Sequence, residues 1–248
     1  AFAQTGTGKT AAFLLPIVDI LLDLKKDKKV KALIIAPTRE LASQIDKQLE
    51  GMAYFTPSDS LAIYGGGDGK DFSQEKKALE NGASIIIATP GRLMSHLKMG
   101  YVDLKELEFL VLDEADKMLD MGFLPDILEI KKHLSGKQQS LLFSATMNPK
   151  IRTLAKSLLK NPKEVSIAMS KPADGIIQAA YLVNDSEKIK LLKTLLKGKE
   201  DQKMIIFSSS KIGVDNITRS LQDLKIGVKA FHSGFEQKER EEIMLEFR

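Results

Sequence analysis

The chain has 248 residues, of which 43% are hydrophobic and 28% charged, and it contains no cysteine. This composition excludes a disordered or fibrous protein, and the missing cysteine excludes a disulfide scaffold, a thiolate metal site and a cysteine nucleophile. The net charge is only +4, which permits nucleic-acid binding without requiring it. No apolar run reaches the ~20 residues that a membrane span needs, so we expect a cytoplasmic protein without a membrane segment.

The first motif lies just ahead of the first expected helix. Residues 3–10 read AQTGTGKT, which matches the phosphate-loop pattern with Ala3 in the place of its first glycine. Gly6 and Gly8 would let backbone N–H groups turn toward phosphate oxygens. Lys9 would reach the β- and γ-phosphates, and Thr10 would offer its hydroxyl to Mg²⁺. The alternative is a glycine-rich turn before a helix.

Four short apolar runs follow, at residues 32–36, 84–88, 109–112 and 141–143. Their continuous, branched and aromatic character is typical of strands buried on both faces. Helix-period stretches separate them, so the order predicts an α/β fold with a parallel sheet. Ligands bind at the carboxyl ends of strands in such sheets. Polar clusters stand there in this chain: PTRE at 37–40, TPGR at 89–92, DEAD at 113–116 and SAT at 144–146.

Asp113 and Glu114 directly follow the run at 109–112, as a Walker B pair follows its strand. One carboxylate would hold Mg²⁺, and the other would orient and deprotonate an attacking water. An acidic helix start is the alternative, because carboxylates there complement the helix dipole. A phosphate loop in the same chain favours the catalytic interpretation.

The pattern lapses at residues 170–178, which read SKPADGIIQ and predict a linker. Strand-like runs then return at 179–183, 204–207 and 228–231, with helical stretches between and after them. We therefore predict a lobe at 1–170, a linker at 171–178 and part of a second lobe at 179–248. The three histidines, which we expect on the surface or in loops rather than as metal ligands, are His96, His133 and His232.

The order of the motifs resembles the DEAD-box ATP-dependent RNA helicases of superfamily 2. VLDEAD at 111–116 is similar to the motif that names the family, and AQTGTGKT to its motif I. The further matches are PTREL at 37–41, the glycines at 65–67, TPGR at 89–92, SAT at 144–146, IIFSSS at 205–210 and QKER at 237–240. The resemblance implies an α/β, parallel-sheet, RecA-like lobe followed by part of a second RecA-like lobe. The sequence of residues 147–181 is most similar to that of bacterial members of the RhlE type.

The resemblance also implies roles for individual residues. ATP would be bound by Thr5, Gly6, Thr7, Gly8, Lys9 and Thr10, with Mg²⁺ held by Thr10 and Asp113. Glu114 would be the general base, assisted in catalysis by Asp113 and Lys9. Nucleotide state would be coupled to lobe closure by Asp116, Ser144 and Thr146. The backbone of RNA would be contacted, without regard to sequence, by Pro37, Thr38, Arg39, Gly66, Thr89, Gly91, Arg92, Ser208, Gln237 and Arg240.

The function that follows is ATP binding and hydrolysis coupled to closure on single-stranded RNA and local duplex unwinding. Two alternatives remain open: an ATP-dependent RNA clamp that does not unwind, and a superfamily 2 DNA helicase. The family's adenine-reading motif, upstream of the phosphate loop, and its late arginine motif have no counterpart in these residues. Because an arginine finger contributes ~10³ to 10⁵ in rate, we expect the isolated chain to be nearly inactive and its intact parent active.

Overall fold

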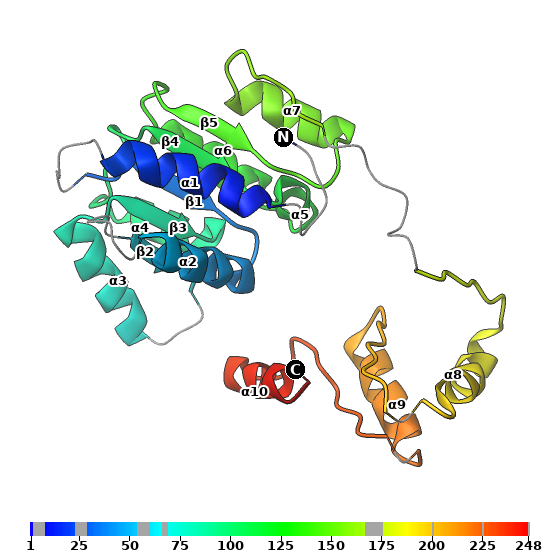
Figure 1. Ribbon diagram of the computed structural model, residues 1–248. Helices are drawn as coiled ribbons and strands as arrows, with labels where there is room; N and C mark the ends of the chain where they lie inside the picture. The colour runs from blue at the N-terminus through cyan, green and yellow to red at the C-terminus, as the bar shows by residue number, and fades with distance from the viewer. Residues whose placement is uncertain are drawn as a thin grey trace. The chain divides into compact units, whose positions relative to one another are not determined.

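The structure is a computed structural model that describes residues 1, 8–22, 29–53, 60–65, 69–166, 176–199, 201–224 and 226–247. The chain divides into two compact units, residues 1–171 and 172–248 (Figure 1). Within the described residues, no helix combines the length and the apolar character needed to cross a membrane.

The first unit is built on a parallel sheet of five strands in the order β2-β3-β1-β4-β5. The strands are β1 (Ala32–Ile35), β2 (Ser60–Ile63), β3 (Ile85–Ala88), β4 (Phe109–Leu112) and β5 (Gln139–Leu142). The predicted parallel α/β fold is therefore confirmed for this unit. The strand that the sequence did not reveal is β2, which lies at an edge, is only half-buried along most of its length, and lacks a continuous apolar run.

Helices cover both faces of this sheet (Figure 1). They are α1 (Lys9–Leu22), α2 (Arg39–Ala53), α3 (Gly69–Asn81), α4 (Pro90–Lys98), α5 (Ala115–Asp120), α6 (Leu124–Lys132) and α7 (Pro149–Leu158). Successive strand residues point to opposite faces, so β1 divides its side chains between two cores. Ala32 and Ile34 pack with α1 and α2, whereas Leu33 and Ile35 pack with α4 to α7.

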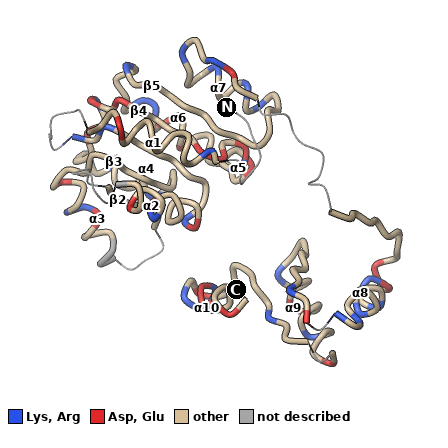
Figure 2. The backbone as a smooth tube through the Cα atoms, viewed as in Figure 1, with Lys and Arg blue, Asp and Glu red and all other residues tan. Residues whose placement is uncertain are grey.

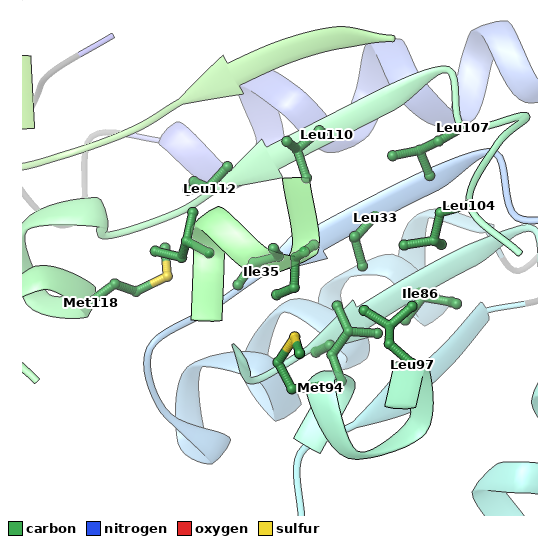
Figure 3. Packing of buried hydrophobic residues seen from close by; sticks show 14 of the residues in the cluster. Leu33, Ile35, Ile86, Met94, Leu97, Leu104, Leu107, Leu110, Leu112 and Met118 are labelled. Atoms are coloured by element: carbon green, nitrogen blue, oxygen red, sulfur yellow. The ribbon is translucent and has the colours of Figure 1, made fainter. Parts of the chain in front are cut away.

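Figure 3 shows the second of these cores from close by, with Met94 and Leu97 of α4 against Leu33 and Ile86 of the sheet. Each fully buried aliphatic side chain contributes roughly 1.5 to 3 kcal/mol relative to an exposed one. Burial on both faces holds the strand ends in place, which fixes the position of every residue that follows a strand.

The second unit contains a short 3-10 turn and three helices in its described part. They are η1 (Asp185–Glu187), α8 (Lys188–Leu196), α9 (Lys211–Leu221) and α10 (Gln237–Phe247). The runs at 179–183, 204–207 and 228–231 are not strands in the structure, so the prediction of strands there is wrong. A strand exists only where its backbone pairs with a neighbour, and these runs pair with none among the described residues. Phe207, at the end of the second of these runs, is 91% exposed.

Candidate functional site

The carboxyl edge of the sheet gathers the polar clusters. The parallel register aligns Ile35 with Ala88 and with Leu112, and Leu112 with Leu142. The segments that follow these strands therefore leave the sheet at one edge. They contain Pro37, Thr38, Thr89, Asp113 and Ser144.

Asp113 is the buried carboxylate of this edge. Asp113 directly follows β4 and is 2% exposed. Its carboxylate accepts a hydrogen bond from the Glu114 N–H at 2.9 Å. Burial raises the pKa of Asp113 above its ordinary value of 3.8, and the positive charge of Lys9 partly opposes that shift. A carboxyl with a raised pKa beside a lysine is typical of a functional site.

Glu114 stands at the start of α5 in a strained conformation. Its φ of 51° and ψ of 49° lie in the left-handed region, which costs a non-glycine residue roughly 1 to 2 kcal/mol. The Ala115 N–H donates to the Phe143 carbonyl at 3.0 Å, and Lys117 Nζ lies 2.8 Å from Glu114 Oε2. Such strain persists where the surrounding structure imposes it, commonly at active sites.

The start of α1 supplies the other half of the candidate site. Helix α1 begins at Lys9, so Lys9 and Thr10 form its first turn, where free N–H groups and the helix dipole favour anions. Gly8 has a φ of +82°, and a Cβ added there would meet no atom within 4 Å, so its backbone conformation rather than crowding requires glycine. Thr5, Gly6 and Thr7 lie outside the described residues.

The donor set fits a magnesium ion bound together with a nucleotide. No group of three or more His, Cys, Asp or Glu residues suited to a metal occurs in the part of the chain that the structure describes. Mg²⁺ does not need one, because it commonly takes one or two carboxylates, substrate phosphates and several waters. Asp113 offers a buried carboxylate, and Thr10 offers a hydroxyl.

Asp116, Ser144 and Thr146 are brought together across the edge. Asp116 Oδ2 accepts hydrogen bonds from the Thr146 N–H at 2.9 Å and the Thr146 hydroxyl at 3.1 Å. The buried Ser144 hydroxyl donates to the Thr146 carbonyl at 2.7 Å. These bonds join the acidic segment after β4 to the segment after β5.

The residues expected to contact RNA in the first unit lie at the starts of α2 and α4. Thr38 Oγ1 accepts the Leu41 N–H at 3.2 Å, and Pro90 opens α4 directly after the buried Thr89. Strands β1 and β3 are paired, so these two helix starts are neighbours. Pro37, Arg39 and Gly91 belong to the same two helix starts, whereas Gly66 lies outside the described residues.

Arg92 is held rather than free. Its Nε donates to Glu75 Oε2 at 2.7 Å, and a Cβ added to Gly65 would lie 3.3 Å from its Cδ. His96, expected on the surface, is completely buried beside the same carboxylate, so that prediction is wrong. The spacing of four residues from Arg92 to His96 places both on one face of a helix. This spacing is the signal in the sequence that the two side chains can share a partner.

In the second unit the structure brings Gln237 and Arg240 together. The Arg240 Nη2 donates to Gln237 Oε1, and Gln237 Nε2 donates to Glu241 Oε1 at 3.0 Å. Ser208 lies instead against the start of α9, where a Cβ added to Gly213 would collide with its hydroxyl.

Charge alone does not mark a nucleic-acid surface. Figure 2 shows Lys and Arg interspersed with Asp and Glu along both units. Any affinity for a polyanion must therefore come from placed residues.

Comparison with known proteins identifies two family matches. The family described as DEAD/DEAH box helicase matches residues 1–154, and the one described as helicase conserved C-terminal domain matches residues 187–248. The DEAD-box ATP-dependent RNA helicase RhpA of Helicobacter pylori is 38% identical over the whole chain, which spans 49% of that relative. The ATP-dependent RNA helicase CshA of Listeria monocytogenes is 37% identical over 99% of the chain, which spans 46% of it.

A solved structure agrees with these matches. The crystal structure of a DEAD box protein from the hyperthermophile Methanococcus jannaschii is 33% identical and has a TM-score of 0.61. The match covers 99% of this chain and 64% of that one. Together with the parallel sheet, it supports a RecA-like fold followed by a portion of a second lobe. The RhlE-type assignment stays a prediction.

Proposed function

Because the chain belongs to the DEAD/DEAH box helicase family, we propose that it binds and hydrolyses ATP and uses that cycle to act on RNA. The observation that carries the proposal is the buried Asp113, with its raised pKa, within electrostatic reach of Lys9. A buried carboxylate next to the amino end of α1 offers one site for a cation and another for the phosphates it accompanies.

The chemical roles follow from this arrangement. Lys9 and the N–H groups at the start of α1 would bind the β- and γ-phosphates, as would Thr5, Gly6, Thr7 and Gly8. Mg²⁺, when bound, would neutralise charge on the phosphates, and Asp113 and Thr10 would hold it. Glu114 would accept a proton from the water that attacks the γ-phosphorus, while the bond to the ADP oxygen breaks. The strained backbone of Glu114 would hold its carboxylate in place for this step.

The hydrogen bonds from Thr146 to Asp116 support a coupling role for these residues and for Ser144. A shift of the segment that contains Asp116, caused by the bound nucleotide, would move the segment after β5 as well. The two hydrogen bonds from Thr146 to Asp116 Oδ2 would transmit that movement. Closure of the two lobes on ATP and RNA would then be a population shift driven by higher affinity for the closed state. Local duplex separation would accompany closure.

RNA would be held by its backbone. The residues at the starts of α2 and α4 in the first unit offer hydroxyls, backbone N–H groups and the Arg92 guanidinium. These groups suit phosphates, which carry no sequence information. Ser208, Gln237 and Arg240 would extend the track on the second lobe. We keep the lobes at 1–170 and 179–248, the linker at 171–178 and a cytoplasmic location as proposals. Because the chain spans about half of its curated relatives, the activity of the whole protein is likewise proposed.

The test is steady-state ATP hydrolysis by the full-length protein with matched single-stranded RNA and DNA, followed by strand separation of a short duplex. We expect stimulation by RNA and ATP-dependent separation. Equal stimulation by DNA would favour the DNA helicase. ATP-dependent retention of RNA without separation would favour the clamp. For the 248-residue chain alone, RNA-stimulated turnover of about 1 per second, within the ordinary range for enzymes, would contradict its expected near-inactivity.

A further inference from the structure

A buried histidine in α4 has no part in the functions proposed so far. His96 is completely shielded from solvent, and both ring nitrogens have partners. Nδ1 is hydrogen-bonded to the Tyr101 hydroxyl, and Nε2 lies 2.8 Å from Glu75 Oε2. The ring stacks on Phe72, with centroids 4.2 Å apart and planes 8° from parallel.

The same Glu75 oxygen also holds Arg92. Arg92 Nε donates to it at 2.7 Å, and both side chains are largely buried. The guanidinium carbon lies 4.7 Å from the centroid of the Phe72 ring. Arg92 is therefore fixed by a carboxylate, an aromatic ring and the close approach of Gly65.

The hydrogen bonds have a consistent direction. Burial, followed by the nearby charges of Glu80 and Glu75, raises the pKa of Tyr101 above its ordinary value of 10. The phenol thus keeps its proton and can donate to His96 Nδ1. With Nδ1 accepting from Tyr101, the hydrogen on Nε2 of His96 donates to Glu75, which accepts from Arg92 as well. Each side chain in this series of hydrogen bonds fixes the orientation of the next.

The Arg92 side chain is largely buried. Arg92 Nη2 is buried and has no hydrogen-bond partner among the described residues. Because Nη2 is shielded, a ligand can reach Arg92 only through the part of its side chain that is exposed, which is 17%. Guanidinium groups bind phosphate through several N–H donors in a fixed plane.

We propose that Glu75 and His96 are positioning residues, which hold Arg92 by its Nε so that its guanidinium group keeps one orientation for donating to a phosphate of bound RNA. This inference rests on the proposed RNA-binding role of Arg92. A side chain that is already ordered loses less conformational freedom on binding, so the arrangement raises affinity without adding a contact to the RNA. Neither Glu75 nor His96 needs to touch the RNA.

The test compares the KM for a single-stranded RNA in ATP hydrolysis by the full-length protein. His96→Phe keeps an aromatic ring against Phe72 but removes the donor to Glu75, and Glu75→Ala removes the acceptor. Both should raise the KM for RNA about three- to tenfold, the loss expected when a charged hydrogen-bond donor is misaligned. Both should leave the KM for ATP and the RNA-free rate unchanged. Glu75→Gln retains an oxygen acceptor and should stay close to wild type.

Gln74→Ala is the control, because Gln74 lies exposed on the same helix beside Glu75. It should leave the KM for RNA unchanged. Thermal unfolding of every variant identifies one that is merely damaged, and Tyr101→Phe, which removes only the hydroxyl, gives a milder version of the His96 change. We expect Tyr101→Phe to raise the KM for RNA in the same direction.

Arg92→Ala separates the inference from the function on which it rests. We expect it to raise the KM for RNA, and we expect His96→Phe to add nothing in that background. If Arg92→Ala has no effect, the RNA-binding role of Arg92 is wrong and the inference goes with it. If Arg92→Ala has its effect but stable His96→Phe and Glu75→Ala proteins do not, only the positioning role is overturned. A His96 effect that persists without Arg92 also overturns it.

Discussion

Replacing Asp113 with asparagine should stabilise the nucleotide-free protein while abolishing its proposed activity. The substitution removes a buried negative charge but keeps an oxygen that can accept the Glu114 N–H, which now lies 2.9 Å from Oδ1. Burial is the main cause of the raised pKa of Asp113, so the ionised carboxylate is disfavoured in the fold. Relief of such unfavourable features at functional sites commonly adds about 0.5 to 2 kcal/mol to the free energy of unfolding.

The sign of the pH dependence follows from the same shift. A carboxyl whose pKa is higher in the folded protein binds more protons when folded, so its contribution to stability falls as pH rises. For Asp113 this window opens near 3.8, the ordinary value, and closes at the raised pKa. The advantage of Asp113→Asn should therefore be small at the lower end of the window and complete above it.

Thermal unfolding without nucleotide or Mg²⁺, at about pH 4.5 and about pH 8, measures this difference. A gain of 1 kcal/mol corresponds to a rise in Tm of about 2 to 4 °C for a domain of this size. Asp103→Asn is the control, since Asp103 is exposed and its carboxylate likewise accepts a backbone N–H, from Lys105 at 2.9 Å. The reasoning is refuted if Asp113→Asn lowers the Tm at pH 8, or raises it no more than the control.

Three further substitutions test other parts of the first unit. Thr146→Ala removes the hydrogen bond from the Thr146 hydroxyl to Asp116. It should lower the rate of duplex separation about tenfold, a typical coupling effect, while RNA-stimulated ATP hydrolysis persists. Equal losses of both activities would contradict a coupling role. Gly65→Ala imposes a φ of +61° on alanine beside Arg92 and should cost about 1 to 2 kcal/mol, measured by denaturant unfolding; an unchanged midpoint would count against it. Asn148→Ala removes the side-chain cap of α7 and should cost about 1 kcal/mol in the same assay.

The first unit could be predicted from sequence because its signals are local. Continuous apolar runs such as residues 84–88 can be buried only between two layers, and the polar clusters after them had to reach one edge of a parallel sheet. The edge strand β2 was not predicted because three of its four residues are partly exposed, so it lacks a continuous apolar run. The left-handed backbone conformation of Glu114 was not predicted either, since nothing in the residue type indicates it.

The network around Arg92 shows a different limit. Glu75, Arg92 and His96 come from two helices, and their contacts depend on how α3 and α4 pack. Sequence spacing puts Arg92 and His96 on one helical face, but it does not say which acidic residue lies opposite. The second unit shows the reverse case, because residues 204–207 have a strand-like composition without a paired neighbour among the described residues.

The most direct test of the account is Glu114→Gln in the full-length protein, with ATP binding and ATP hydrolysis measured on the same sample in the presence of RNA. The account predicts that affinity for ATP is retained while hydrolysis falls by ~10² to 10⁴, the usual contribution of a general base. Hydrolysis within a few-fold of the wild-type rate would contradict it.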